Sequence, residues 1–273
     1  MFKDKNSIVH AHGGFKMKII QYNVLDGCQE PGRLSLLKNW IANQQADIVG
    51  FNELNDWTKE SLADFAEQTY FSYSYLFEDQ PSKYRIGLMS KTPIEYKGCL
   101  TEHFWHGVIH VKTAGINIII THLSPAESVS REKEAASIAA HMVNMQNEPA
   151  LLMGDMNTLS AHDSRYYTEA NMLQLLNGNE KLSLKFCHHG TINYKPMQIL
   201  LDSGLTDVGT SHGFQHSVPT QMNEDAMHAA KLRLDYVLVN KALLQRNPAA
   251  SICYDQETDL ISDHYPIVCT WSS

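Results

Sequence analysis

Apolar and polar residues follow two distinct patterns along the chain. Short runs of apolar and β-branched residues predict buried strands, and apolar residues three or four positions apart predict amphipathic helices. Strands are predicted at 18–24, 47–51, 71–77, 85–89, 108–111, 116–120, 150–154, 232–239 and 265–271, and helices at 33–45, 58–70, 128–145, 169–176 and 196–203. Strands outnumber helices and often follow one another directly. This order predicts an α/β (α+β) fold in which two mixed, mostly antiparallel sheets pack face to face with helices outside.

The length of the chain fits one large domain. With 273 residues, 43% of them hydrophobic, the chain can bury a substantial core. No linker, low-complexity run or internal repeat divides it. We expect a single domain over residues 17–273, preceded at 1–16 by a flexible lead-in or residues left by cloning, which contain His10, His12, Gly13 and Gly14.

Charge and cysteine usage narrow the functional classes. The net charge is −8, so bulk electrostatics do not indicate nucleic-acid binding, although an acidic surface suits a site that gathers divalent cations. The five cysteines are odd in number and form no CxxC pair, which argues against a disulfide scaffold or a zinc site. Reduced thiols predict a cytoplasmic location. No apolar run approaches ~18 residues, so no transmembrane segment is expected.

The run Ala150–Asn157 carries the first candidate chemistry. A short apolar run closed by Gly154 predicts a buried strand, and two polar residues follow at Asp155 and Asn157. On an extended chain, residues two apart point the same way, so both side chains would face one pocket. A carboxylate and an amide placed there can hold a hard cation or orient a water. The alternative is an ordinary polar turn after a strand.

Further polar residues lie beside the ends of other predicted strands or, as Asp235 does, within one. They are Asn23, Glu53, His122, Asp235, Asp263 and His264. A single Glu or His in such a place is usually a solvated or structural residue, but together these residue types suit metal-assisted phosphodiester hydrolysis. Glu53, helped by Asn23 and Asp26, could bind Mg²⁺, which would polarise the phosphoryl oxygen. Asp155 could orient or deprotonate the water, and His264, oriented by Asp235, could stabilise the transition state or deliver a proton.

Seven short sequence motifs indicate a resemblance to a known family. In chain order they are Tyr22-Asn23-Val24, Phe51-Asn52-Glu53-Leu54, Gly87-Leu88-Met89-Ser90-Lys91-Thr92-Pro93-Ile94, Thr121-His122-Leu123, Gly154-Asp155-Met156-Asn157, Arg233-Leu234-Asp235-Tyr236 and Ser262-Asp263-His264-Tyr265-Pro266. With them the chain resembles the endonuclease/exonuclease/phosphatase superfamily, which shares the fold of pancreatic deoxyribonuclease. The resemblance covers residues 18–271 and implies a four-layered sandwich with the site at one mouth.

The resemblance also implies roles for individual residues. It implies Mg²⁺ or Mn²⁺ held by Glu53, with Asn23 nearby and Asp263 contributing. Asp155 and Asn157 would act at the nucleophile and His264 at the phosphate, supported by Asp235, with His122 as a second histidine near the scissile phosphate. One departure is Asn52-Glu53, where the family commonly has Gln-Glu.

Other residues are weaker candidates for contacting substrate. His106 could flank a phosphate or stack on a base, although its neighbour Trp105 equally fits a core position. Tyr84 could stack on a base, and Thr220 could line the site from the segment before the Asp235 strand. The stretch His188-His189-Gly190 is interpreted as a loop.

These patterns predict a metal-dependent phosphodiester hydrolase, with a nuclease acting on DNA or RNA favoured and a monomer expected. The alternative is a phosphoesterase for a small-molecule or lipid-linked phosphate, because substrate does not follow from fold. A binding protein on an inactive scaffold is a third class, which the complete set of site residues opposes.

Overall fold

Two six-stranded sheets form the centre of the computed structural model, which describes residues 16–222 and 230–272. The strands of the first sheet are β1 (Lys16–Asn23), β2 (Ile48–Asn52), β3 (Tyr73–Phe77), β4 (Ile86–Ser90), β13 (Ala249–Ile252) and β14 (Ile267–Ser272). Those of the second are β5 (Glu95–Leu100), β6 (Val108–Thr113), β7 (Ile116–His122), β8 (Ala150–Asp155), β11 (Thr206–Asp207) and β12 (Asp235–Val239). The strand orders are β13-β14-β1-β2-β4-β3 and β11-β12-β8-β7-β6-β5.

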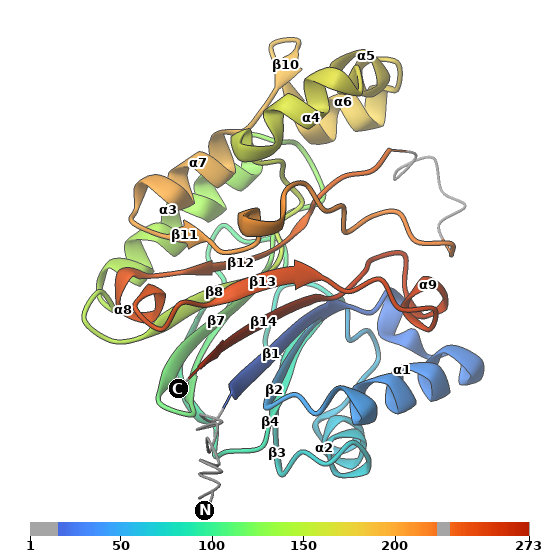
Figure 1. The fold of residues 1–273 in the computed structure, drawn as a ribbon, viewed down its shortest axis with the longest axis vertical. Coiled ribbons are helices and arrows are strands. Elements are labelled where there is room, and N and C mark those ends of the chain that lie inside the picture. The colour runs from blue at the N-terminus through green and yellow to red at the C-terminus, as the bar shows by residue number, and fades with distance from the viewer. Residues whose placement is uncertain (1–15, 223–229, 273) are drawn as a thin grey trace, which may run out of the picture.

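Helices lie on the outer faces of the two sheets (Figure 1). The first sheet is covered by α1 (Pro31–Gln44) and α2 (Lys59–Gln68), and the second by α3 (Ser130–Val143) and α7 (Lys195–Asp202). Between β8 and α7 the chain forms α4 (Ser164–Glu169), α5 (Met172–Asn177), α6 (Glu180–Phe186) and the hairpin of β9 (Cys187–His188) and β10 (Thr191–Ile192). Two short helices, α8 (Lys241–Leu244) and α9 (Thr258–Ile261), flank β13. The predicted four-layered sandwich is confirmed.

The core lies between the sheets and under the helices. Alternate side chains of both sheets, such as Ile19 and Ile48 from one and Ile118 and Leu151 from the other, form one apolar cluster. The opposite faces pack on α1 and α2 in a second cluster and on α3 and α7 in a third. Because strands such as β2, β7 and β8 are buried on both faces, they appear in the sequence as continuous apolar runs.

Two parallel strand pairs bring polar residues to one edge of the sandwich. Most neighbouring strands are antiparallel, but β1 pairs with β2 and β7 with β8 in parallel. The first pair sets Asn23 opposite Asn52, and the second sets His122 opposite Asp155. β12 runs antiparallel to β8, and its first residue, Asp235, also lies opposite Asp155. The carboxyl ends of β1, β2, β7 and β8 and the start of β12 therefore lie at the same edge of the sandwich.

Gly154 permits the close approach of β7 and β8 just before Asp155. Its φ is 149°, and a Cβ at this position would collide with the backbone carbonyl of Thr121. Another residue here would push β8 away from β7 and displace the carboxylate that follows. The glycine that closes the apolar run is thus required by packing as well as by backbone conformation.

Several elements differ from the sequence-based expectation. The helix predicted at 169–176 is divided into α4 and α5 because Asn171 adopts a left-handed conformation, with φ of 50°. The strand predicted from Leu232 begins only at Asp235, and Leu232 forms an isolated bridge with Val218. Helix α6 and strands β5 and β13 were not predicted. Of the stretch interpreted as a loop, His189 and Gly190 form the turn of the β9–β10 hairpin, whereas His188 is the last residue of β9.

The structure describes the predicted domain from its first strand onward, but only the last residue of the predicted lead-in. β1 begins at Lys16, which the sequence assigned to the lead-in, and the rest of the lead-in lies outside the described residues. Among the helices of the described segments, none is long and apolar enough to cross a membrane.

Candidate active site

The parallel pair β1–β2 places an amide beside a carboxylate at the edge of the sandwich. Asn23 is buried, and its Nδ2 donates to Oε1 of Glu53 (3.1 Å) and to Oδ2 of Asp155 (3.2 Å). Glu53 follows β2 in a left-handed conformation, with φ of 63°. Its Oε2 accepts a hydrogen bond from the backbone N–H of Asp26 (2.9 Å). A non-glycine residue held in this conformation is a common feature of functional sites.

Asp155 lies at the end of β8, in the centre of the polar cluster. Its Oδ2 lies 3.3 Å from Nε2 of His122, and its Oδ1 accepts from the backbone N–H of Asn157 (2.8 Å). The sequence placed Asp155 and Asn157 on one extended strand, but β8 ends at Asp155 and Asn157 has φ of 47°. A tight turn, rather than strand alternation, therefore brings both residues to the same cavity.

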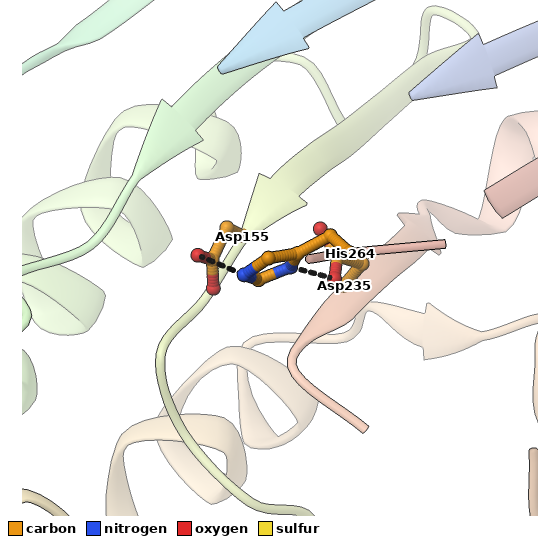
Figure 2. A group of neighbouring side chains, drawn as sticks. All are labelled: Asp155, Asp235 and His264. Atoms are coloured by element: carbon orange, nitrogen blue, oxygen red, sulfur yellow. Dashed lines mark hydrogen bonds and ion pairs between the residues drawn. The ribbon is translucent and has the colours of Figure 1, made fainter. Parts of the chain in front are cut away.

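His264 lies between two buried carboxylates. Figure 2 shows its imidazole ring with Asp235 on one side and Asp155 on the other. Nδ1 lies 2.7 Å from Oδ2 of Asp235, and Nε2 lies 3.7 Å from Oδ2 of Asp155. Ser217 holds Asp235 by accepting a hydrogen bond from its backbone N–H at Oγ (3.1 Å). This pairing of Asp235 with His264 is the one expected from the sequence.

Three carboxylates control the charge of His264. Burial alone would lower the pKa of His264, but the attraction of Asp235, Asp155 and Asp263 outweighs it and raises the pKa to about 10. Burial would likewise raise the pKa of Asp155, yet His264 and His122 hold it well below its usual value. The site therefore contains an imidazolium beside an ionised carboxylate at neutral pH.

A cavity of about 350 Å³ opens beside this cluster. Its lining includes Glu53, His122, Asp155, Asn157, Asp263 and His264, together with Leu25, Asp26, Tyr84, Trp105, His106, Pro125 and Lys185. Residues separated by more than two hundred positions in the sequence thus share one concave surface. Cavities of this kind are the usual location of small-molecule and catalytic sites.

The three weaker candidates for substrate contact have different positions. Tyr84 and His106 line the cavity, with their rings edge to face at 5.4 Å. Thr220 lies outside the cavity lining, and its hydroxyl donates to the backbone carbonyl of Ser262 (2.5 Å). It supports the segment that precedes Asp263 and His264 instead of facing the cavity.

His106 also packs against His122, another residue of the cavity wall. The two imidazole rings stack with centroids 4.2 Å apart and planes 15° apart, while Nδ1 of His106 lies 2.6 Å from Oγ of Ser82. Burial, reinforced by His122, lowers the pKa of His106 to about 2. His106 is therefore a neutral ring that supports His122.

Three carboxylates that could contribute oxygen ligands to a hard divalent cation line the cavity. Glu53, Asp26 and Asp263 all line the cavity, and carboxylate oxygens are the ligands that Mg²⁺ prefers. Asn23 directs its amide nitrogen at two carboxylates, so turning its oxygen toward them would be favourable only with a cation between. A second group, Asp155, Asp235 and His264, has ligand atoms within 4.8 Å of one another. There the 2.7 Å contact between His264 and Asp235 already occupies one ring nitrogen.

Two residues of the site were not identified from the sequence. Asn52 was noted only as a departure from the family pattern, yet its buried side chain contacts both sheets. Lys185 comes from α6, a helix that was not predicted, and no spacing in the sequence connects it to the site.

Comparisons with known proteins agree with this architecture. A model of the endonuclease/exonuclease/phosphatase family matches residues 20–264, and the chain belongs to this family. The predicted enzyme class, a hydrolase of the nuclease and phosphodiesterase type, is thereby confirmed. No sequence among curated proteins matches significantly.

Solved structures share the fold at low sequence identity. An AP endonuclease from Archaeoglobus fulgidus is 19% identical with a TM-score of 0.69, covering 94% of this chain and 100% of its own. A 3'-5' exonuclease (NExo) from Neisseria meningitidis is 20% identical with a TM-score of 0.67 and the same coverages. TDP2 from D. rerio, complexed with a single-strand DNA product, is 15% identical with a TM-score of 0.63, covering 94% of this chain and 99% of its own.

Proposed function

We propose that this protein hydrolyses phosphodiester bonds in DNA or RNA with the help of Mg²⁺ or Mn²⁺. The observation that carries the proposal is the convergence on Asp155 of groups from both sheets, with Asn23 at 3.2 Å and His122 at 3.3 Å from its Oδ2. Nucleic acid is favoured because the structural relatives include a 3' phosphatase bound to a product DNA hairpin and a TDP2 complexed with a single-strand DNA product.

Each side chain has a role that its surroundings support. Asp155 stays ionised and can orient a water or accept its proton. His264, held by Asp235, is protonated and can stabilise charge on the phosphate or donate a proton. Asn157 and His122 line the same cavity and can bind the phosphate oxygens.

The metal would be held by Glu53 and Asp263, with Asn23 joining them if its amide oxygen turns inward. A bound divalent cation supplies Lewis-acid polarisation of the phosphoryl oxygen and offsets negative charge. Without a cation, the carboxylates of Asp26, Glu53, Asp155 and Asp263 around one cavity would repel a phosphate.

A substrate panel tests the activity. The panel comprises single-stranded, double-stranded and abasic DNA, RNA, bis-p-nitrophenyl phosphate and inositol phosphates, each with Mg²⁺. Cleavage of a nucleic acid supports the proposal, and turnover restricted to inositol phosphates contradicts the nuclease assignment. Lack of turnover of every substrate, with Mg²⁺ or Mn²⁺, contradicts the activity itself.

A phosphoesterase for a small or lipid-linked phosphate is the second candidate, favoured by the net charge of −8. Salt dependence separates the two candidates. Many phosphate contacts to a long strand give a steep loss of affinity with salt, whereas one phosphate gives a shallow one.

The cellular location and the oligomeric state are also part of the proposal. All five cysteines are free thiols, which fits the cytoplasmic location expected from the sequence. We also expect a monomer. Cell fractionation and light scattering would test these two points, with a membrane-bound fraction or a stable dimer contradicting them.

A further inference from the structure

Helix α6 carries a lysine at a position where its pattern calls for an apolar residue. Leu182, Lys185 and Phe186 share the inner face of α6 at three- and four-residue spacing, and all three are buried. Only 7% of the Lys185 surface is exposed. Lys181, one turn earlier on the same helix, is exposed. The side chain of Lys185 reaches the cavity that Asp155 and His264 also line.

The backbone around Lys185 is fixed by helix α3 and by the loop between β7 and α3. The guanidinium of Arg131, itself fully buried, donates to the carbonyl of Lys185 and also to that of Ser124 (2.7 Å). The backbone N–H of Ser128 donates to the carbonyl of Leu184 (3.1 Å), and its hydroxyl donates to that of Cys187 (3.0 Å). These bonds to three carbonyl groups within four residues fix the point from which the lysine side chain extends.

The ammonium of Lys185 has no anionic partner within the described residues. Its Nζ makes no hydrogen bond or ion pair there, and it lies 5.2 Å from the centroid of the Phe186 ring. Burying an ammonium that contacts no carboxylate is unfavourable for folding, so its position calls for a reason other than stability. Burial lowers the pKa of Lys185 to about 8, against the attraction of Asp155.

We propose that Lys185 binds a non-bridging oxygen of the scissile phosphate. This inference rests on the proposed function, because it assumes that a phosphate enters this cavity. Of the described residues that line the cavity, Lys185 is the sole lysine or arginine, facing carboxylates from Asp26, Glu53, Asp155 and Asp263. An arriving phosphate could accept a hydrogen bond from the ammonium, and the lysine would offset repulsion between the phosphate and these carboxylates. The segment between β8 and α7 therefore contributes directly to the active site.

Binding of inorganic phosphate tests the inference without requiring turnover. The variants are Lys185→Met, which keeps the length of the stem, Lys185→Arg, which keeps the charge, and Lys181→Met as the matched control. We expect the phosphate Kd, measured calorimetrically, to rise roughly 10- to 100-fold in Lys185→Met, as for loss of one charge-assisted hydrogen bond. Lys185→Arg and Lys181→Met should stay within about threefold of the wild type. An unchanged Kd in Lys185→Met overturns the inference.

Turnover of bis-p-nitrophenyl phosphate tests whether Lys185 contacts the scissile phosphate or a neighbouring one. This substrate has a single phosphate, so a lysine that binds a neighbouring phosphate of a strand would not affect it. We expect Lys185→Met to lower kcat/KM by at least roughly tenfold, and Lys185→Arg to restore part of it. Wild-type kcat/KM in Lys185→Met would contradict the assignment to the scissile phosphate.

Thermal unfolding separates this role from a structural one. Replacing a buried, unpaired cation by methionine should leave the melting temperature unchanged or raise it, whereas a residue needed for packing would lower it. If Lys185→Met does not fold, a structural role is indicated and Lys185→Gln provides the phosphate-binding comparison. If the wild type cleaves no phosphodiester, the proposed function fails while the phosphate Kd still decides the role of Lys185.

Discussion

The side chain of Asn52 accepts a hydrogen bond from the backbone N–H of Asp155, with 2.8 Å between Oδ1 and N. Its Nδ2 donates to the carbonyl of Thr121 (2.9 Å), and Oδ1 also accepts from Nε2 of Gln21 (2.9 Å). Asn52 belongs to the first sheet, whereas Thr121 and Asp155 belong to the second. One buried amide therefore links the parts of the candidate active site that the two sheets contribute.

Replacing Asn52 should destabilise the protein and disturb catalysis together. Asn52→Leu leaves a buried N–H of Asp155 and a buried carbonyl of Thr121 without partners, which costs about 2–4 kcal/mol in free energy of unfolding. Urea denaturation measures this cost, with the exposed Asn39→Leu as the control. A loss below about 0.5 kcal/mol would show that the bridge is not important for stability.

Removing the carboxylate that orients His264 should lower turnover while preserving the fold. In Asp235→Asn, the charge that favours the imidazolium is lost, and we expect kcat to fall about 10²- to 10⁴-fold. The variant is compared with Asp64→Asn on the exposed face of α2, which should retain wild-type kcat. Equal kcat in both variants would remove Asp235 from the mechanism.

Chelation should abolish activity in a reversible manner. The oxygen donors of Glu53 and Asp263 suit a hard cation, so EDTA is expected to stop hydrolysis and excess Mg²⁺ or Mn²⁺ to restore it. Glu53→Gln should require a higher metal concentration for half-maximal activity. A fully active enzyme in EDTA would exclude the proposed metal.

The buried His106 should make the fold sensitive to mild acid. Burial and His122 lower its folded pKa from 6.5 to about 2, so the unfolded chain binds a proton below pH 6.5 that the folded chain does not. Stability therefore falls as the pH decreases from about 6.5, by up to about 1.4 kcal/mol per unit for this group. His106→Phe should show a shallower decline between about pH 6.5 and 4.5 in denaturation with EDTA present. If the free energy of unfolding fell equally with decreasing pH in the wild type and in His106→Phe, His106 would not be the cause of the acid sensitivity.

The sequence predicted most of the fold because both sheets are built from strongly apolar strands. Residues that directly follow such strands, including Glu53 and His122, could be assigned to the site from position and residue type. The sequence also predicted that Asn157 faces the cavity, but for the wrong reason. A turn after β8, and not the alternation of side chains along a strand, directs Asn157 into the cavity.

The remaining features depend on tertiary contacts that leave no local pattern. Lys185 reaches the cavity because Arg131, far away in the chain, holds its backbone carbonyl. Thr220 fits a site residue by sequence, but a hydrogen bond to Ser262 turns it to a supporting role. Asn171 divides a predicted helix by a single left-handed residue, which the apolar spacing does not indicate.

The most direct test of the account is the kcat of Asp155→Ala and His264→Ala beside the wild type, on the best substrate of the panel and with saturating Mg²⁺. Both residues are buried at the centre of the cluster, and we expect each variant to lose at least roughly 10²-fold in kcat while its circular dichroism spectrum is unchanged. Near-normal turnover in either folded variant would contradict the mechanism.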